Sequence, residues 1–191
     1  PPSVFKVIMI GDLGVGKSSI VRRIQFQQFE ENYQPKPGLA DFHYRTVFEE
    51  KEIELQIWDA NMEHILTLFP AHIIYYRGAK AVILVYDQTN LNSSKDFSLW
   101  LQDFREQVNT PVYFAIAANK DDLPNKTVNN QKIKSWCDKN GFGFFLTSAK
   151  TGAGIDEMID KIVENVVKLN ENDNHPTTVI LNNSDENCEK S

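Results

Sequence analysis

The sequence is poor in cysteine and contains no long apolar run. Only two of its 191 residues are cysteines, Cys137 and Cys188, and they stand in no metal-ligand spacing. Such a pair forms no disulfide framework, so we expect a reducing compartment and no cysteine nucleophile. No apolar run approaches the roughly 18 residues that span a bilayer, and no signal-peptide pattern follows Pro1. We therefore expect a cytoplasmic protein, or one attached to a membrane from its cytosolic side.

The sequence also lacks a basic cluster. Its formal net charge is −6, and its lysines and arginines are scattered along the chain. Proteins that bind nucleic acids or anionic membranes through charge usually carry a basic patch. We therefore expect no nucleic-acid partner and no electrostatic attraction to a membrane, so any phosphate chemistry must be local.

The composition is typical of one globular domain followed by a tail. A chain of 191 residues, 41% hydrophobic and 24% charged, can bury a full core without metals or disulfides. We assign residues 1–169 to this domain. Residues 170–191 are dominated by Asn, Asp and Glu, so we expect an acidic, mostly flexible tail. Its short β-prone run, residues 177–181, is expected to be exposed, with an added edge strand as the alternative.

A phosphate-binding pattern lies near the start of the chain. Residues 11–18 read GDLGVGKS and fit G-x-x-x-x-G-K-[ST]. In this pattern glycines let backbone N–H groups surround an anion, the lysine neutralises outer phosphates and the hydroxyl ligates Mg²⁺. The apolar run 4–10 predicts a buried strand before the loop, and residues 17–28 predict a helix whose N-terminus favours phosphate. A glycine-rich surface turn is the alternative, and this context argues against it.

Hydrophobic periodicity predicts alternating strands and helices. Ile53, Leu55 and Ile57 alternate with polar residues, which indicates a hairpin strand with one packed face. The continuous apolar runs 81–86 and 112–118 predict strands buried on both faces. We expect a mixed, mostly parallel sheet with helices on both faces and a ligand at the C-terminal strand ends. The predicted strands are 4–10, 42–48, 52–59, 81–86, 112–118 and 142–147, and the clear helices are 17–28, 94–108, 129–140 and 155–169.

Two segments of this pattern need separate predictions. Residues 94–108 carry Phe97, Trp100, Leu101 and Phe104 at helical spacing, and we interpret this stripe as core. Ser93 or Ser94 could cap that helix. Residues 60–76 show no clean period, and a proline within them would interrupt a helix, so their order stays open.

Two further motifs follow predicted strands and point to a base. Asn119-Lys120-Asp121-Asp122 comes directly after the run 112–118, and Ser148-Ala149-Lys150 directly after the run 142–147. A carboxylate at Asp122 could accept two N–H donors from the edge of guanine, whereas adenine offers no such pair. Each motif alone would be a weak indication. Their order and their positions at strand ends favour guanine over the substrates of other phosphotransferases.

With these motifs, the sequence resembles the Ras superfamily of small GTPases, most closely the Rab family, over about residues 4–169. The resemblance implies a Rab-like G domain with the P-loop GTPase fold: a six-stranded, mostly parallel sheet with one antiparallel edge strand. It also implies GTP or GDP with Mg²⁺ and a surface that switches between nucleotide states. The matching segments are GDLGVGKSS (11–19), LQIWD (55–59), YYRGA (75–79), VYD-x-T from Val85, NKDD (119–122) and TSAKTG (147–152).

The family's binding roles carry over by position. The phosphates would be held by Gly14, Val15, Gly16, Lys17, Ser18 and Ser19. The base would be held by Asn119, Lys120 and Asp122 and backed by Ser148, Ala149 and Lys150. Ser18 would ligate Mg²⁺ directly, and Asp59 would hold it through water. Segments 29–40 and 60–76 would be the two switches that bind effector or regulatory proteins.

The departures from the family fall on γ-phosphate sensing. Lys36 stands where the family has a Mg²⁺-ligating threonine, although it could contact a phosphate or simply be a solvated charge. Met62 replaces a glycine that lets the backbone approach the γ-phosphate. Glu63 replaces the glutamine that orients the attacking water, where a carboxylate would be repelled by the triphosphate. Leu13 crowds a position that is small in the family.

These departures predict binding without efficient catalysis. We expect a Rab-like guanine-nucleotide-binding protein of vesicle trafficking with very slow or absent GTP hydrolysis. No catalytic residue is assigned, because Glu63 occupies the water-positioning site and is expected to be inactive. The alternative is a pseudo-GTPase, a scaffold or dimerisation module whose bound nucleotide is structural. Oligomeric state stays open, including a dimer.

The C-terminus carries a weak lipidation signal. Cys188-Glu189-Lys190-Ser191 has the outline of a prenylation box, but its middle residues are charged and the preceding tail is acidic. We therefore expect prenylation to be absent, and attachment to endomembranes only if Cys188 is lipidated. The sequence is also compatible with a domain cut from a longer protein.

Overall fold

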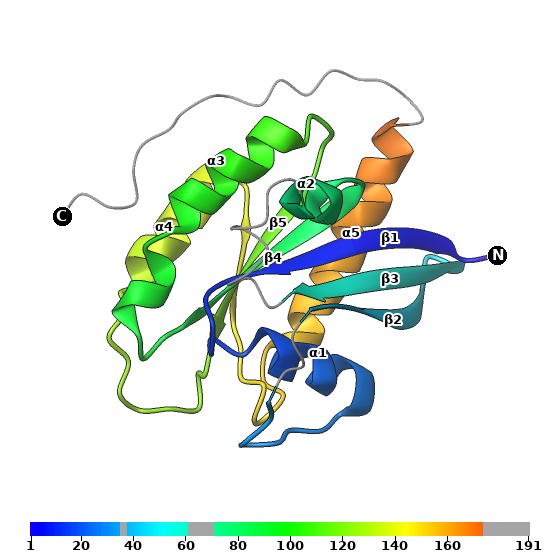
Figure 1. The fold of residues 1–191 in the computed structure, drawn as a ribbon. Helices are drawn as coiled ribbons and strands as arrows, with labels where there is room; N and C mark the ends of the chain where they lie inside the picture. Colours follow the sequence, from blue (N-terminus) through cyan, green and yellow to red (C-terminus); the bar gives the residue numbers. More distant parts are fainter. Residues whose placement is uncertain (35–37, 61–70, 174–191) are drawn as a thin grey trace.

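A single mixed sheet organises the chain (Figure 1). The structure is a computed structural model that describes residues 1–34, 38–60 and 71–173. The six strands lie in the order β2-β3-β1-β4-β5-β6, and all neighbours are parallel except the antiparallel pair β2 and β3. This confirms the predicted fold class. The strands are β1 Ser3–Ile10, β2 Leu39–Phe48, β3 Lys51–Ala60, β4 Ala79–Asp87, β5 Tyr113–Asn119 and β6 Gly143–Leu146.

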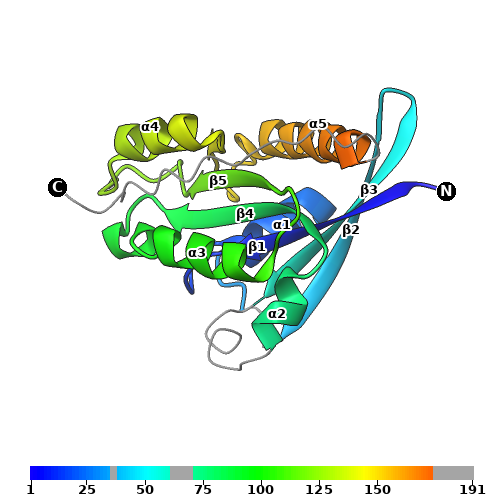
Figure 2. The same cartoon turned by 90° about the horizontal axis from the view of Figure 1, so that it is seen from above.

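Helices cover both faces of the sheet. One apolar cluster joins α1 and α5 to the sheet, and a second joins α2, α3 and α4 to the other face. Figure 2 shows α3 and α5 on opposite sides of β4 and β5. The helices are α1 Lys17–Phe26, α2 Ala71–Tyr76, α3 Phe97–Gln107, α4 Asn130–Asn140 and α5 Ile155–Asp173, with a short 3₁₀ turn, η1, at Leu91–Ser94.

The central strands are apolar on both faces because both faces are covered. In β1, Val7 and Met9 join the α1–α5 side, while Ile8 and Ile10 join the opposite side. The residues of β4 alternate between the two clusters in the same way. A strand with no exposed face has no position for a polar side chain, which explains the continuous apolar runs.

The β2–β3 hairpin has the predicted alternation and turn. Ile53, Leu55 and Ile57 are buried, and the turn contains Glu49 and Glu50, both with left-handed φ angles of 48° and 63°. β2 begins at Leu39, three residues before the predicted strand, because its pairing with β3 continues to Ala60. The hairpin is therefore longer than its apolar pattern indicates.

The predicted cap of the third helix is wrong. α3 begins at Phe97, and its N-cap is Asp96, whereas Ser93 and Ser94 belong to η1. The hydroxyl of buried Ser93 donates to the carbonyl oxygen of Asn90 (2.7 Å) and accepts from the backbone N–H of Asp87 (3.0 Å). Ser93 thus fastens the turn after β4 instead of starting α3. The apolar stripe of α3 is buried, as predicted.

Two other helix boundaries differ from the predictions. α1 ends at Phe26, before the predicted end, because Gln27 adopts a left-handed conformation with φ 55°. α5 continues to Asp173. The run 177–181 lies outside the described residues. Within the described chain, no helix has both the length and the apolar character needed to cross a membrane.

Candidate nucleotide-binding site

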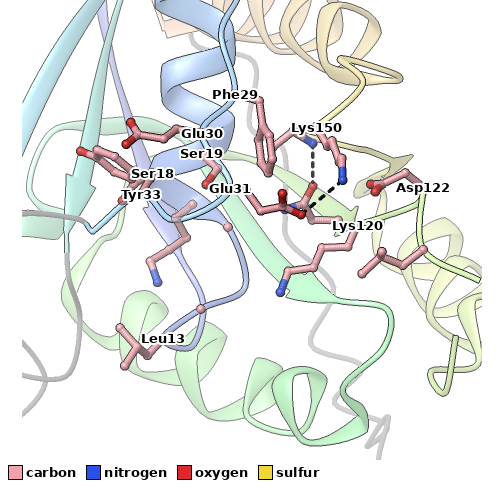
Figure 3. Close-up of a pocket in the computed structure, with 16 residues that line it drawn as sticks. Leu13, Ser18, Ser19, Phe29, Glu30, Glu31, Tyr33, Lys120, Asp122 and Lys150 are labelled. Carbon is pink, nitrogen blue, oxygen red and sulfur yellow. Dashed lines mark hydrogen bonds and ion pairs between the residues drawn. The ribbon is translucent and has the colours of Figure 1, made fainter. Parts of the chain in front are cut away.

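A pocket of about 370 Å³ lies where the phosphate-loop pattern meets the two base motifs (Figure 3). Ser18 lies at one end of it and Asp122 at the other. Most of the predicted binding residues line this pocket: Gly14, Gly16, Lys17, Ser18, Ser19, Asn119, Lys120, Asp122, Ala149 and Lys150. Val15 and Ser148 do not line the pocket, but each is hydrogen-bonded to a residue that does, Val15 to Asn119 and Ser148 to Asp122. The structure therefore brings together segments that are more than a hundred residues apart.

The phosphate loop turns sharply into α1. Gly16 is the N-cap of α1 with φ 101°, and a Cβ atom there would lie only 2.3 Å from the Asn119 side-chain nitrogen. Gly16 makes no side-chain cap, so the first N–H groups of α1 remain available for an anion. The Lys17 ammonium donates to the carbonyl oxygens of Gly11 (2.6 Å) and Asp12 (2.8 Å), which holds it over the loop.

Asn119 joins the phosphate loop to the loop after β6. Its side chain is buried; Nδ2 donates to the carbonyl oxygen of Val15 (2.8 Å), and Oδ1 accepts from the N–H of Ala149 (3.2 Å). The Thr147 hydroxyl donates to the same Oδ1 atom at the longer distance of 3.4 Å. The amide thus fixes the separation between the phosphate and base ends of the pocket.

Asp122 is oriented by its neighbour in the second base motif. The Ser148 hydroxyl donates to Asp122 Oδ1 at 2.6 Å and accepts from the N–H of Thr151 at 3.1 Å. A carboxylate has two oxygens and about four acceptor sites, so it can accept further N–H donors. The arrangement suits a ligand edge that carries two adjacent N–H groups.

Lys120 is held by a residue that the sequence analysis did not assign. Its backbone is left-handed at φ 63°, and its ammonium lies 2.7 Å from Asp87 Oδ2. Asp87 Oδ1 accepts from the N–H and the hydroxyl of Thr89. Burial raises the pKa of Asp87, but the bonds from Lys120 and Thr89 outweigh it and leave the pKa below its usual value. The sequence signal available for this role was the position of Asp87, an acidic residue directly after the apolar run 81–86.

The site also fits a magnesium ion. Asp59, at the end of β3, is 8% exposed, and its Oδ1 has no hydrogen-bond partner among the residues described. Burial raises the pKa of Asp59, while a hydrogen bond with Ser18 and the charge of Lys17 act in the opposite direction. Hard carboxylate and hydroxyl oxygens are the ligands that Mg²⁺ prefers, so Ser18 and Asp59 suit this ion.

The structure describes one of the four departures from the family pattern. Leu13 lines the pocket at its rim with 57% of its surface exposed (Figure 3). Lys36, Met62 and Glu63 lie outside the described residues. Leu13 therefore lies at the phosphate end, where the sequence predicts that it crowds the site. The effects of all four departures remain sequence predictions.

Several residues around the pocket were not assigned from the sequence. Phe29, Glu30, Glu31, Tyr33 and Leu123 line it. Arg23 does not line the pocket, but it donates from Nε to the carbonyl oxygen of Ala149 (2.9 Å) and from Nη2 to that of Lys150 (2.5 Å), two residues that do. These contacts join distant segments, so no local pattern indicated them, although residues 29–33 fall in the loop assigned to a switch.

Sequence comparisons agree with this geometry. Residues 6–168 match the sequence model of the Ras family. The chain is 33% identical to Ras-related protein Rab5A of Oryza sativa subsp. japonica over 179 residues, which cover 93% of this chain and 87% of that protein. It is 37% identical to Ras-related protein Rab-2B of Dictyostelium discoideum over 168 residues (86% and 81%). It is 34% identical to Ras-related protein Rab-13 of Bos taurus over 184 residues (92% and 89%).

Proposed function

The chain belongs to the Ras family of small GTPases and is close to the Rab proteins, and from this premise we propose that it binds GTP or GDP with Mg²⁺ and acts in vesicle trafficking. The observation that carries the proposal is the bridge made by Asn119 between the phosphate loop and the loop after β6. It sets two chemically different ends of one pocket at a fixed separation. A ligand with both an anionic and a guanine end satisfies both.

At the phosphate end, charge and backbone geometry act together. The Lys17 ammonium, which contacts two loop carbonyls, would turn to phosphate oxygens beside the N–H groups of α1. Ser18 and Asp59 would hold Mg²⁺, which neutralises phosphate charge when bound. At the other end, Asp122 would accept two N–H groups of guanine in the orientation set by Ser148.

Hydrolysis is proposed to be very slow or absent. Met62 and Glu63 replace the residues that sense the γ-phosphate and orient water, and Leu13 occupies the rim of the phosphate end. Each lost positioning contact in this class of reaction costs several kcal/mol of transition-state stabilisation. The cradle and the base contacts are unaffected, so binding persists.

Protein partners are proposed to contact segments 29–40 and 60–76, the two loops that correspond to the switches of the family. Four residues of the first loop line the pocket, so a ligand there would contact this loop directly: Phe29, Glu30, Glu31 and Tyr33. Membrane attachment would require lipidation of Cys188.

Direct identification of the ligand tests the proposal. The purified protein is denatured and the released nucleotide is identified by chromatography, and affinities for GDP and a non-hydrolysable GTP analogue are then measured with and without Mg²⁺. Guanine nucleotide bound by the wild type and lost in Lys17→Ala supports the proposal; no binding under either condition would overturn it. Equal affinities, with unchanged amide exchange at residues 29–38, would favour the scaffold alternative.

A further inference from the structure

An ion pair joins two walls of the pocket. The Glu31 carboxylate lies 3.4 Å from the Lys150 ammonium, although 119 residues separate them in the sequence (Figure 3). Both residues line the pocket, Glu31 from the loop after α1 and Lys150 from the loop after β6. We call residues 27–33 the α1 loop. The ion pair is a link from the α1 loop to the base end of the site.

The α1 loop is also held to its own helix. Arg22 of α1 lies 3.3 Å from the Glu30 carboxylate, and its guanidinium lies 4.4 Å from the centre of the Tyr33 ring. At the start of the loop, Gln27 exchanges hydrogen bonds with Arg23: its N–H donates to the Arg23 carbonyl oxygen, and Arg23 Nη1 donates to its carbonyl. The loop therefore has a fixed base beside α1.

The opposite wall is also fixed at the backbone. Arg23 donates to the carbonyl oxygens of Ala149 (2.9 Å) and Lys150 (2.5 Å), which ties the loop after β6 to α1. The side chains of Glu31 and Lys150 are 77% and 50% exposed, so their contact is the part that can open without disturbing the core. An exposed pair of this kind is weak and is screened by salt.

We propose that the Glu31–Lys150 ion pair is a gate that slows the release of bound guanine nucleotide; this rests on the proposed function of the pocket. In this proposal, the nucleotide leaves the pocket between the α1 loop and the loop after β6, the two walls that the ion pair joins. Opening that path separates two opposite charges that the closed state holds together. Glu31 therefore acts as a positioning residue for the base end, through Lys150, and controls the lifetime of the complex.

The test measures release of a fluorescent GDP analogue chased by excess GDP. Glu31→Gln should release it about two- to fivefold faster than the wild type at low salt, the range expected for one exposed ion pair. At about 0.5 M salt the two rates should converge, because screening weakens the pair in the wild type. Glu52→Gln removes the same charge from the start of β3, at the strand end opposite to the pocket. This control variant should release the analogue at the wild-type rate.

Charge exchange separates a gate from a general structural effect. Glu31→Lys should release the analogue faster than Glu31→Gln, because it places two ammonium groups together. Because Lys150 also lines the base end of the pocket, the exchanged pair, Glu31→Lys with Lys150→Glu, is compared with Lys150→Glu alone. Restored opposite charges should make release slower in the exchanged pair than in that single variant. Urea unfolding of each variant shows whether the fold is retained, and the rate ratios are compared only among folded variants.

The outcomes that overturn the gate are distinct from those that overturn nucleotide binding. Wild-type binding that is lost in Lys17→Ala, combined with an unchanged release rate in Glu31→Gln at every salt concentration, would refute the gate alone. Release from the exchanged pair that is as fast as release from Lys150→Glu alone would refute it as well. A wild-type protein that binds no guanine nucleotide would refute both proposals at once.

Discussion

The side-chain Nδ2 of Asn119 donates to the carbonyl oxygen of Val15 at 2.8 Å, across 104 residues of sequence. The same amide accepts from the N–H of Ala149, so one buried side chain touches both the phosphate loop and the loop after β6. Neither loop is a helix or a strand, and Arg23 ties only the loop after β6 to α1. The geometry of the pocket therefore depends on a side chain that a sequence motif alone would assign to the ligand.

Asn119→Asp should weaken both folding and nucleotide binding. The substitution preserves shape, but a carboxylate would face the Val15 carbonyl without a proton to donate. Leaving a buried polar group without a hydrogen-bond partner lowers the free energy of unfolding by about 1–3 kcal/mol. Urea unfolding without nucleotide isolates the structural part of this loss, and Thr147→Val, which removes only the 3.4 Å contact to Asn119, is the milder control. Wild-type stability in Asn119→Asp would contradict the bridge.

Gly16→Ala should prevent the pocket from forming in its present shape. Its Cβ would lie 2.3 Å from Asn119 Nδ2, and its φ of 101° is disfavoured for any side chain. Gly78→Ala is the matched control, because Gly78 also has a positive φ, 78°, but its Cβ would meet nothing within 4 Å. The control should lose only about 1 kcal/mol of stability from backbone strain. Comparable losses in the two variants, measured by thermal unfolding, would contradict the close packing at Gly16.

Asp122→Asn should change the preferred base. An amide at this position presents both a donor and an acceptor, so it loses one of the two guanine contacts and suits xanthine, which carries a carbonyl oxygen in place of the exocyclic amine. Guanine affinity should fall at least about tenfold, which corresponds to roughly 1.4 kcal/mol. Competition between GDP and xanthosine diphosphate measures the change. Ser148→Ala, which releases Asp122 and also removes the acceptor of the Thr151 N–H, should lower guanine affinity without a gain for xanthine.

The parts of the fold that the sequence predicted are those where burial leaves no choice. Both faces of β4 and β5 are covered, so each strand is a continuous apolar run, and the runs at 81–86 and 112–118 indicated them directly. The alternation in β3 similarly indicated a hairpin, whose turn lies at Glu49 and Glu50 between the predicted strands 42–48 and 52–59. In each case one physical requirement accounts for every residue of the segment.

The parts that could not be predicted depend on contacts between distant segments. Ser93 has the chemistry of a helix cap, but its hydroxyl is used by Asp87 and Asn90 at the end of β4. The ion pair between Asp87 and Lys120 similarly joins the ends of two neighbouring strands. A local pattern reports which groups are present and not which distant group they meet, so the motif positions were predictable and their mutual supports were not.

The stability of the β2–β3 hairpin should depend on pH through His43. Its Nδ1 lies 2.7 Å from Glu54 and its Nε2 lies 3.4 Å from Asp41. The hydrogen bond with Glu54, together with both carboxylate charges, raises the pKa of His43 above its usual value. A raised pKa in the folded state contributes stability that is complete below the unfolded pKa, about 6.5, and is lost as the pH rises through the folded pKa.

The free energy of unfolding of the wild type should therefore fall above about pH 6.5 relative to that of His43→Gln. Urea unfolding between about pH 6 and 9 measures the difference and avoids the acidic range in which Glu54, whose pKa is lowered, would itself protonate. Arg45→Gln keeps His43 beside Glu54 and should retain the wild-type dependence. If the free energy of unfolding varies with pH in the same way in the wild type and in His43→Gln, the stabilising role of His43 would be contradicted.

Hydrolysis should be partly restored by returning the second switch toward the family pattern. Met62→Gly lets the backbone approach the γ-phosphate, and Glu63→Gln replaces a repelled carboxylate with a group that can orient water. The double variant should hydrolyse GTP at least about tenfold faster in a single turnover, because one positioning contact is worth more than 1.4 kcal/mol in such a site. Nucleotide affinity should not change. An unchanged rate would move the dominant defect to Lys36 or to Leu13 at the rim of the pocket, and Leu13→Gly added to the double variant would then distinguish between them.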